Sequence, residues 1–218
     1  MIKAVIFDMD GVMIDSEPLW EKTEKIMMAN RGLVYTPVYR EKIVGLGQKD
    51  SAILLKDTFG LEDETEEIIN SRISILLDIY DEELELVSGL ESLLESLSDS
   101  PLKVALASSS PIRVINFVLD KFELGKYFDP VVSGDMVENG KPNPDIYLHT
   151  AGLIGLNPTE CVVIEDSING VVSAKAADMN CIAVPDKRLD PSGFKKADVI
   201  MDELEMVKLE ALMNFRSS

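Results

Sequence analysis

The sequence predicts an α/β fold, in which a parallel β-sheet lies between layers of helices and a bundle of helices is inserted near the N-terminus. Three observations favour this class. Apolar, strand-like runs alternate with helical patterns from about Ser88 onward, small or polar residues follow each run, and a long helix-rich stretch follows the first run. With 218 residues, 46% of them hydrophobic, the chain can bury one large core or two modest ones.

Four short apolar runs are expected to form buried parallel strands, because near-continuous hydrophobic stretches are typical of strands covered on both faces. These runs are Ala4 to Phe7, Val104 to Ala107, Cys161 to Ile164 and Cys181 to Val184. Helices are expected between the later runs. Helical spacing relates Leu90, Leu93, Leu94 and Leu97, and also Val114, Phe117 and Val118 after Pro111.

The stretch from about Ser16 to Leu84 contains no convincing strand and is expected to be an inserted helical domain. The core domain would then comprise residues 1–15 and 85–218, and the inserted domain residues 16–84. Apolar faces for a small helical bundle are expected from Met27, Met28, Ile43, Ile53, Leu54, Leu55, Ile68, Ile69, Ile73, Leu76 and Leu77.

Charge narrows the range of partners. The formal net charge of −18 and the pI near 4.4 disfavour nucleic acid and anionic membranes, because the field of the protein would repel both. A phosphorylated small molecule would need local positive charge, a metal ion and backbone amides. No stretch approaches the roughly 18 to 20 apolar residues of a membrane span, and a strand is expected almost at the N-terminus. A cytoplasmic monomer is expected, with Cys161 and Cys181 reduced and buried.

The first strand runs directly into Asp8-Met9-Asp10-Gly11. Side chains at i and i+2 of an extended segment point to the same side, so Asp8 and Asp10 are expected to converge on one site. Two close carboxylates need a divalent cation or a shared proton, which suits metal-assisted acid/base chemistry, and Gly11 permits a sharp turn. If the pair stood alone, a polar strand end or an Asx turn without function would be the better explanation.

Three further elements fall where such a sheet would bring them together. Ser108-Ser109-Ser110 precedes a helix, where hydroxyls and backbone amides can bind an anion. Lys141 stands in a stiff loop between Gly140 and Pro142. Glu165-Asp166-Ser167 is a second acidic pair, although Asp166 or Ser167 could simply cap the next helix. Carboxylates for a hard cation, groups that bind phosphoryl oxygens and one lysine together predict phosphoryl transfer.

With these residues, the chain resembles the haloacid dehalogenase superfamily, whose four motifs match Asp8 to Gly11, the serines from Ser108, Lys141 with Pro142, and Glu165 with Asp166. The resemblance implies a Rossmann-like core. A helical cap after the first motif is similar to the β-phosphoglucomutase-like subfamily, and IDSEPLW, LASSSP and EDSINGVVSAKAA resemble 2-deoxyglucose-6-phosphate and hexitol phosphatases.

This resemblance implies a Mg²⁺-dependent phosphatase for a small phosphorylated sugar or polyol. Asp8 would be the nucleophile that forms an aspartyl-phosphate, and Asp10 the acid/base that contacts the metal only through its backbone carbonyl. Asp8 and Asp166 would bind Mg²⁺, with Glu165 either a ligand or the group that orients a water molecule. The phosphoryl group would lie against Ser108, the amide of Ser109, and Lys141.

The loop from Gly45 to Asp50 resembles the cap loop that reads the substrate, with Gln48 and Lys49 as candidates, although an ordinary solvated loop fits equally well. Trp20 could stack on a sugar or serve only in packing. A β-phosphoglucomutase is the main alternative, but the resemblance leads us to expect a histidine where Trp20 stands, which favours hydrolysis. A phosphoacceptor signalling domain is a third reading, and it would need no helical cap.

Overall fold

The computed structural model describes residues 1–36, 38–39, 43 and 46–215, and its chain divides into two compact units. The first comprises Met1–Ile14 and Leu86–Ser218, and the second Asp15–Glu85. Each unit is described by itself below. Among the described residues, no helix is both long and apolar enough to cross a lipid bilayer.

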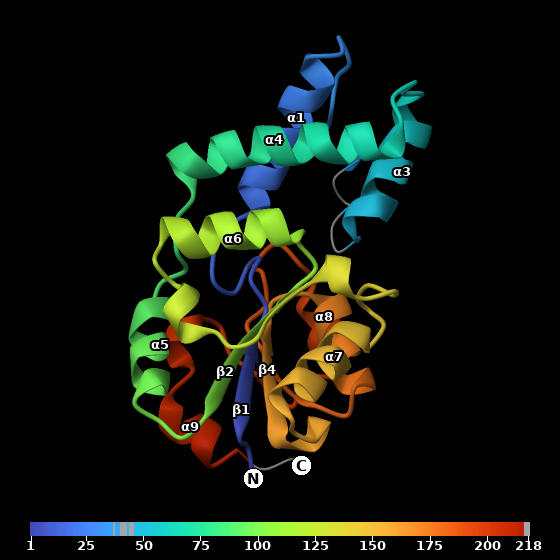
Figure 1. The fold of residues 1–218 in the computed structure, drawn as a ribbon. Coiled ribbons are helices and arrows are strands. Elements are labelled where there is room, and N and C mark those ends of the chain that lie inside the picture. Colours follow the sequence, from blue (N-terminus) through green and yellow to red (C-terminus); the bar gives the residue numbers. More distant parts are fainter. Residues whose placement is uncertain (37, 40–42, 44–45, 216–218) are drawn as a thin grey trace. The chain divides into compact units, whose positions relative to one another are not determined.

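The first unit is built on a six-stranded parallel sheet, which confirms the predicted α/β class (Figure 1). The strands lie in the order β3-β2-β1-β4-β5-β6. Their bounds are β1 Ala4–Phe7, β2 Lys103–Ser108, β3 Val131–Ser133, β4 Cys161–Glu165, β5 Asn180–Ala183 and β6 Val199–Ile200. Four of them are the strands that the apolar runs predict. The strands β3 and β6 have only three and two residues, too few to show a pattern in the sequence.

Register aligns the carboxyl ends of the three central strands. Phe7 of β1 pairs with Leu106 of β2 on one side and with Ile164 of β4 on the other. The residues that follow these positions therefore emerge at the same edge of the sheet, where ligands of open parallel sheets bind. Asp8, Ser108 and Glu165 all lie at this edge.

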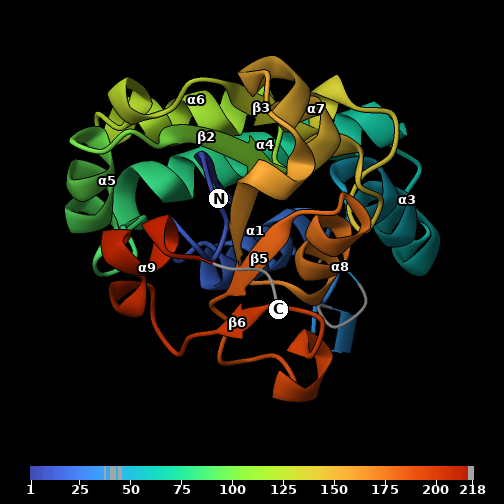
Figure 2. The same cartoon turned by 90° about the horizontal axis from the view of Figure 1, so that it is seen from below.

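Helices cover both faces of the sheet. Figure 1 shows α5 (Leu90–Ser98) and α9 (Leu209–Met213) on one side, and α7 (Asp145–Ile154) and α8 (Ile168–Ala176) on the other. Figure 2 shows the sheet from below with α6 (Ile112–Lys121) near β2 and β3. One apolar cluster joins the strands to α7 and α8, and both cysteines are buried in it as free thiols, as predicted.

The second unit consists of α1 (Glu17–Ala29), α3 (Gln48–Phe59), α4 (Thr65–Glu83) and the segments between them. Met27, Met28, Leu55 and Ile68 lie in its core, as the apolar pattern predicts. Ile53 does not: its side chain is 39% exposed, on the outer face of α3. Helical spacing alone did not distinguish the two faces, because α3 carries the apolar run Ala52 to Leu55.

Candidate functional site

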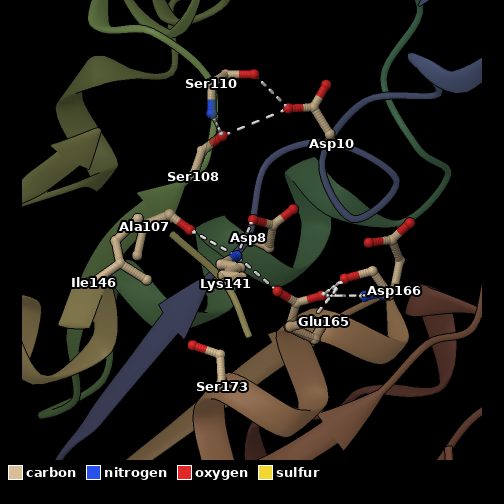
Figure 3. Close-up of polar contacts among 12 residues, drawn as sticks. Asp8, Asp10, Ala107, Ser108, Ser110, Lys141, Ile146, Glu165, Asp166 and Ser173 are labelled. Atoms are coloured by element: carbon tan, nitrogen blue, oxygen red, sulfur yellow. Dashed lines mark hydrogen bonds and ion pairs between the residues drawn. The ribbon is translucent and has the colours of Figure 1, made fainter. Parts of the chain in front are cut away.

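The candidate site lies at the carboxyl edge of the sheet, where four segments distant in sequence bring their polar side chains together (Figure 3). Asp8 follows β1, Ser108 ends β2, Lys141 lies in the loop before α7, and Glu165 ends β4. Asp8, Ser108 and Glu165 are buried, and the Lys141 side chain is only 6% exposed. Lys141 contacts both Asp8 and Glu165, so the structure brings together residues of the first strand, the loop before α7 and the end of β4.

Lys141 forms the centre of the site. Its ammonium donates to Asp8 Oδ1 at 2.6 Å and to Glu165 Oε1 at 2.7 Å, and its contact with the carbonyl of Ala107 is longer, at 3.5 Å. Burial opposes the charge of Lys141, but Asp8 and Glu165 raise its pKa above the ordinary lysine value. The ammonium therefore stays charged and neutralises part of the acidic cluster.

Asp8, Glu165 and Asp166 form a group of three carboxylates, each with one oxygen that lies within 4.8 Å of the corresponding oxygens of the other two. Burial raises the pKa of Asp8 to about 8, opposed by Lys141 and reinforced by the negative charges of Glu165 and Asp10. Burial, with Glu165 and Asp8 nearby, likewise raises the pKa of Asp166 well above its usual range. Such crowding of negative charge is relieved by a cation.

A divalent cation fits this group by the chemistry of its donors, since hard cations prefer carboxylate oxygens. Within the described part of the chain, no donor contacts the carboxylate of Asp166, so its oxygens are available. Glu165 differs. Its Oε1 accepts from Lys141 and Tyr147, and its Oε2 accepts from the amides of Asp166 and Ser167 and from the Ser167 hydroxyl.

These contacts explain why the pKa of Glu165 is lowered, whereas the pKa values of Asp8 and Asp166 are raised. Burial by itself would raise the pKa of Glu165, but the charge of Lys141 and the hydrogen bonds from Lys141, Tyr147 and Ser167 bring it below the usual value. The residue stays ionised, and Asp8 and Asp166 stand out as the carboxylates that need a cation. Ser167 also caps α8 by accepting from the Gly170 amide, so the capping role considered from sequence coexists with the acidic site.

Asp10 lies at the same edge, but its carboxylate turns away from the other three acids. Its Oδ2 accepts from the Ser110 hydroxyl at 2.8 Å, and the Ser108 hydroxyl lies 3.5 Å away. Asp8 and Asp10 are close enough for the charge of Asp10 to raise the pKa of Asp8, but they have different hydrogen-bond partners. The strand ends at Phe7, so Asp10 belongs to a turn and strand alternation no longer fixes its direction.

Hydrogen bonds between serine hydroxyls and the backbone of Ser110 hold the serine turn in place. The Ser108 hydroxyl accepts from the Ser110 amide at 3.0 Å, and the Ser110 carbonyl accepts from the Ser133 hydroxyl of β3. Ser109 is half-buried between them, and its carbonyl packs against Gly134. The sequence analysis includes Ser110 in the serine run but gives individual roles only to Ser108 and Ser109, whereas in the structure Ser110 makes the short contact with Asp10.

Tyr147 is a second residue that sequence reasoning missed. Its hydroxyl donates to Glu165 Oε1 at 2.7 Å, and its ring centroid lies 4.8 Å from the Lys141 ammonium. A tyrosine at this spacing after Lys141 gives no signal of its own, because the same residue would fit the buried face of α7 for packing alone.

The three candidates of the helical unit have different surroundings. Trp20 in α1 is 6% exposed, and the Arg72 guanidinium lies 5.3 Å from its ring centroid. Gln48 begins α3 and accepts from Arg72 at 3.1 Å, whereas Lys49 beside it is exposed. Gly45, the first residue of the predicted substrate-binding loop from Gly45 to Asp50, lies outside the described residues.

A buried lysine from a loop joins an acidic group suited to a cation, a serine turn and a separate aspartate, all at the ends of three parallel strands. Together these groups define an α/β enzyme for reactions at an anionic centre. The chain belongs to the haloacid dehalogenase-like hydrolase family, which matches residues 5–184.

Similar proteins include the hexitol phosphatase B of Escherichia coli K12, 32% identical over 230 residues that cover 97% of each chain. A phosphorylated carbohydrates phosphatase of Thermotoga maritima is 35% identical over 181 residues, covering 83% of this chain and 84% of that protein. Among solved structures, CbbY from Rhodobacter sphaeroides in complex with phosphate superposes with a TM-score of 0.88 at 25% identity, over 98% of this chain and all of that one.

Proposed function

We propose that this protein is a Mg²⁺-dependent phosphatase that hydrolyses a small phosphorylated sugar or polyol through an aspartyl-phosphate. Membership in a hydrolase family and similarity to proteins named as phosphatases of hexitols and phosphorylated carbohydrates support the hydrolysis of phosphoric monoesters. The observation that carries the proposal is the division of the aspartates: Asp8 faces Lys141, and Asp10 faces Ser110.

The division suits the two roles that the reaction requires. An oxygen of Asp8 attacks phosphorus while the bond from phosphorus to the sugar oxygen breaks, and Asp10 gives its proton to that leaving oxygen. Asp10 then takes a proton from a water molecule, whose oxygen attacks the phosphorus of the aspartyl-phosphate. As that bond forms, the bond from phosphorus to the Asp8 oxygen breaks, which releases inorganic phosphate and leaves Asp8 as a carboxylate and Asp10 protonated, as at the start.

The other polar groups would stabilise the transferring phosphoryl group. The Ser108 hydroxyl and the Ser109 amide would donate to its oxygens, and Lys141 would offset its negative charge and that of Asp8. Asp8 and Asp166 would hold Mg²⁺, with an oxygen of Glu165 within the same group and the Asp10 backbone carbonyl as a further contact. The ion would neutralise the carboxylates and polarise a phosphoryl oxygen.

In the helical unit, Lys49 is the candidate that we propose as a substrate contact. Its exposed ammonium can bind an anionic or hydroxyl-rich ligand, whereas Trp20 and the Gln48 carbonyl are already engaged by Arg72. Replacing Lys49 by alanine should raise KM for the best substrate with little change in kcat. An unchanged KM would remove Lys49 from the substrate site.

The proposal is tested by phosphate release from a panel of sugar and polyol phosphates, with Mg²⁺ and with a chelator. We expect release from at least one hexose or hexitol phosphate, only when Mg²⁺ is present. No release from the whole panel would contradict the proposal. Conversion of β-glucose 1-phosphate to glucose 6-phosphate faster than phosphate release would make the protein a mutase, and a stable phosphoaspartate without turnover would indicate signalling.

A further inference from the structure

Tyr147 contacts both members of the buried ion pair at the site. It is fully buried in the first turn of α7, a helix that packs on β2 and β3. Its hydroxyl donates to Glu165 Oε1, while the face of its ring lies 4.8 Å from the Lys141 ammonium. Figure 3 shows the contact between Lys141 and Glu165. An aromatic ring at this distance attracts a cation.

Glu165 is held in a single position. Its Oε2 accepts three hydrogen bonds from Asp166 and Ser167, and a Cβ at Gly170 would lie 1.7 Å from its Oε1. Glycine at position 170 therefore leaves the space that this carboxylate fills. With Oε2 occupied, Oε1 is the atom through which Glu165 acts on Lys141.

The Lys141 ammonium is shared between two carboxylates at nearly equal distances, 2.6 Å to Asp8 and 2.7 Å to Glu165. Its position depends on the relative strength of these two attractions. The Tyr147 hydroxyl donates to the same Glu165 oxygen at 2.7 Å, which satisfies part of that oxygen's hydrogen-bonding capacity. Without the hydroxyl, a buried oxygen that has lost one donor attracts the ammonium more strongly.

We propose that Tyr147 is a positioning residue for Lys141. Its hydroxyl limits the pull of Glu165 and so keeps the ammonium on Asp8 and on the phosphoryl group that Asp8 receives, while its ring borders the ammonium on another side. The catalytic part of this inference rests on the proposed phosphatase function. The electrostatic part concerns Lys141 alone and can be measured without turnover.

The first test is Tyr147→Phe, which keeps the ring and removes the hydroxyl. We expect kcat to fall about tenfold, the effect of one lost charge-linked hydrogen bond, with KM unchanged. Thr150→Val is the matched control: it lies in the same helix, is fully buried and loses a hydroxyl bonded to the Ile146 carbonyl at 2.7 Å. A control that loses as much kcat as Tyr147→Phe would show a merely structural effect and overturn the proposal.

The second test uses protein labelled with ¹⁵N at the lysine side chains, because a buried, hydrogen-bonded ammonium gives a resolved NMR signal. The Lys141 signal, assigned by its loss in Lys141→Met, should shift in Tyr147→Phe and stay in place in Thr150→Val. An unmoved signal in Tyr147→Phe overturns the proposal. If the Lys141 signal shifts in Tyr147→Phe but the wild-type protein hydrolyses no phosphate ester, the positioning role stands and the phosphatase function is contradicted.

Should Tyr147→Phe not fold, 3-fluorotyrosine incorporated into the wild-type sequence provides the same measurement. Fluorine makes the phenol a stronger hydrogen-bond donor, so the Lys141 signal should shift, and Tyr147 is the tyrosine whose ring lies against this ammonium in the described structure. A Lys141 signal identical in fluorinated and ordinary protein would overturn the proposal.

Discussion

Asp166 occupies the space that a side chain at Gly11 would fill: a Cβ at residue 11 would lie 2.0 Å from Asp166 Oδ2. Gly11 also has φ of +79°, in the left-handed region that favours glycine. Gly11 thus serves two needs, the turn after Asp10 and the close approach of the Asp166 carboxylate, which follows β4. The first need can be read from the sequence, whereas the second appears only in the fold.

Gly11→Ala should therefore damage the site more than a turn substitution alone would. Backbone strain costs about 1–2 kcal/mol, and the added methyl must displace Asp166 from the acidic group. We expect Mg²⁺ affinity and kcat each to fall at least about tenfold, a modest loss of ligand geometry. Gly32→Ala is the control, because Gly32 also has positive φ but nothing near its Cβ. Equal Mg²⁺ affinity in the two variants would contradict the clash.

Asp8→Asn should abolish phosphate release, because an amide oxygen is a poor nucleophile and the aspartyl-phosphate cannot form. The expected fall in kcat is on the order of 10³-fold or more. Circular dichroism should show a folded protein, since asparagine is nearly isosteric. Phosphate release at the wild-type rate, in enzyme purified away from host phosphatases, would remove Asp8 as the nucleophile.

Mg²⁺ should bind more tightly as pH rises. Burial raises the pKa of Asp8 to about 8, so at neutral pH the metal-free carboxyl is largely protonated and the ion must displace a proton. We expect the affinity measured by calorimetry to increase from pH 6 to pH 9, with protons released into the buffer. An affinity independent of pH over this range would show that Asp8 does not titrate as the structure indicates.

Binding of Mg²⁺ should also stabilise the folded protein against thermal unfolding. At 100 times its dissociation constant a ligand contributes about 2.7 kcal/mol, which raises Tm by several degrees. Asp166→Asn should lose this Mg²⁺-induced shift. Asp178→Asn should keep it, because Asp178 is exposed and its positive φ of 58° suits asparagine. An undiminished shift in Asp166→Asn would remove that residue from the ligand set.

Glu160 links the start of β1 to the turn before β4, and its contribution to stability should depend on pH. Hydrogen bonds from Lys3 and from the Asn157 backbone lower its pKa to about 2. A carboxyl with a depressed folded-state pKa stabilises the protein above its unfolded value, near 4.5, and loses that effect as pH falls toward 2. Urea unfolding should find Glu160→Gln less stable than wild type at pH 7, with the gap closing in acid. A gap of constant size would contradict the assignment.

Arg72 and Glu24 form a buried ion pair in the helical unit, with side-chain exposures of 2% and 0%. Arg72→Met would strand the Glu24 carboxylate and should cost about 3–5 kcal/mol, whereas Glu24→Leu with Arg72→Met should recover most of the loss. Arg31→Met breaks the partly exposed pair with Asp63 and should cost at most about 1 kcal/mol. Denaturant unfolding measures the free energy of unfolding of all three variants. Similar losses in Arg72→Met and Arg31→Met would contradict the role of burial.

Much of the core could be predicted because its signals are local. Apolar runs such as Ala4 to Phe7 and Cys161 to Ile164 have no helical alternative of sufficient length, and each runs directly into its motif. The short strands β3 and β6 could not be found, since two or three residues carry no periodicity. The role of Ser110 and the presence of Tyr147 at the site were not predicted for a different reason, because serine in a turn and tyrosine on a buried helix face are common without any function.

The sequence by itself determined which residues meet, because parallel strands place their carboxyl ends at one edge and Asp8, Ser108 and Glu165 each stand at such an end. Only the tertiary structure decided how they divide their tasks. In the turn after Phe7, the Asp10 carboxylate accepts a hydrogen bond from Ser110, and Asp8 contacts Lys141 instead. The packing of α7 places the Tyr147 ring against the Lys141 ammonium. Directions of side chains beyond a strand end depend on contacts between distant segments, and no local pattern encodes them.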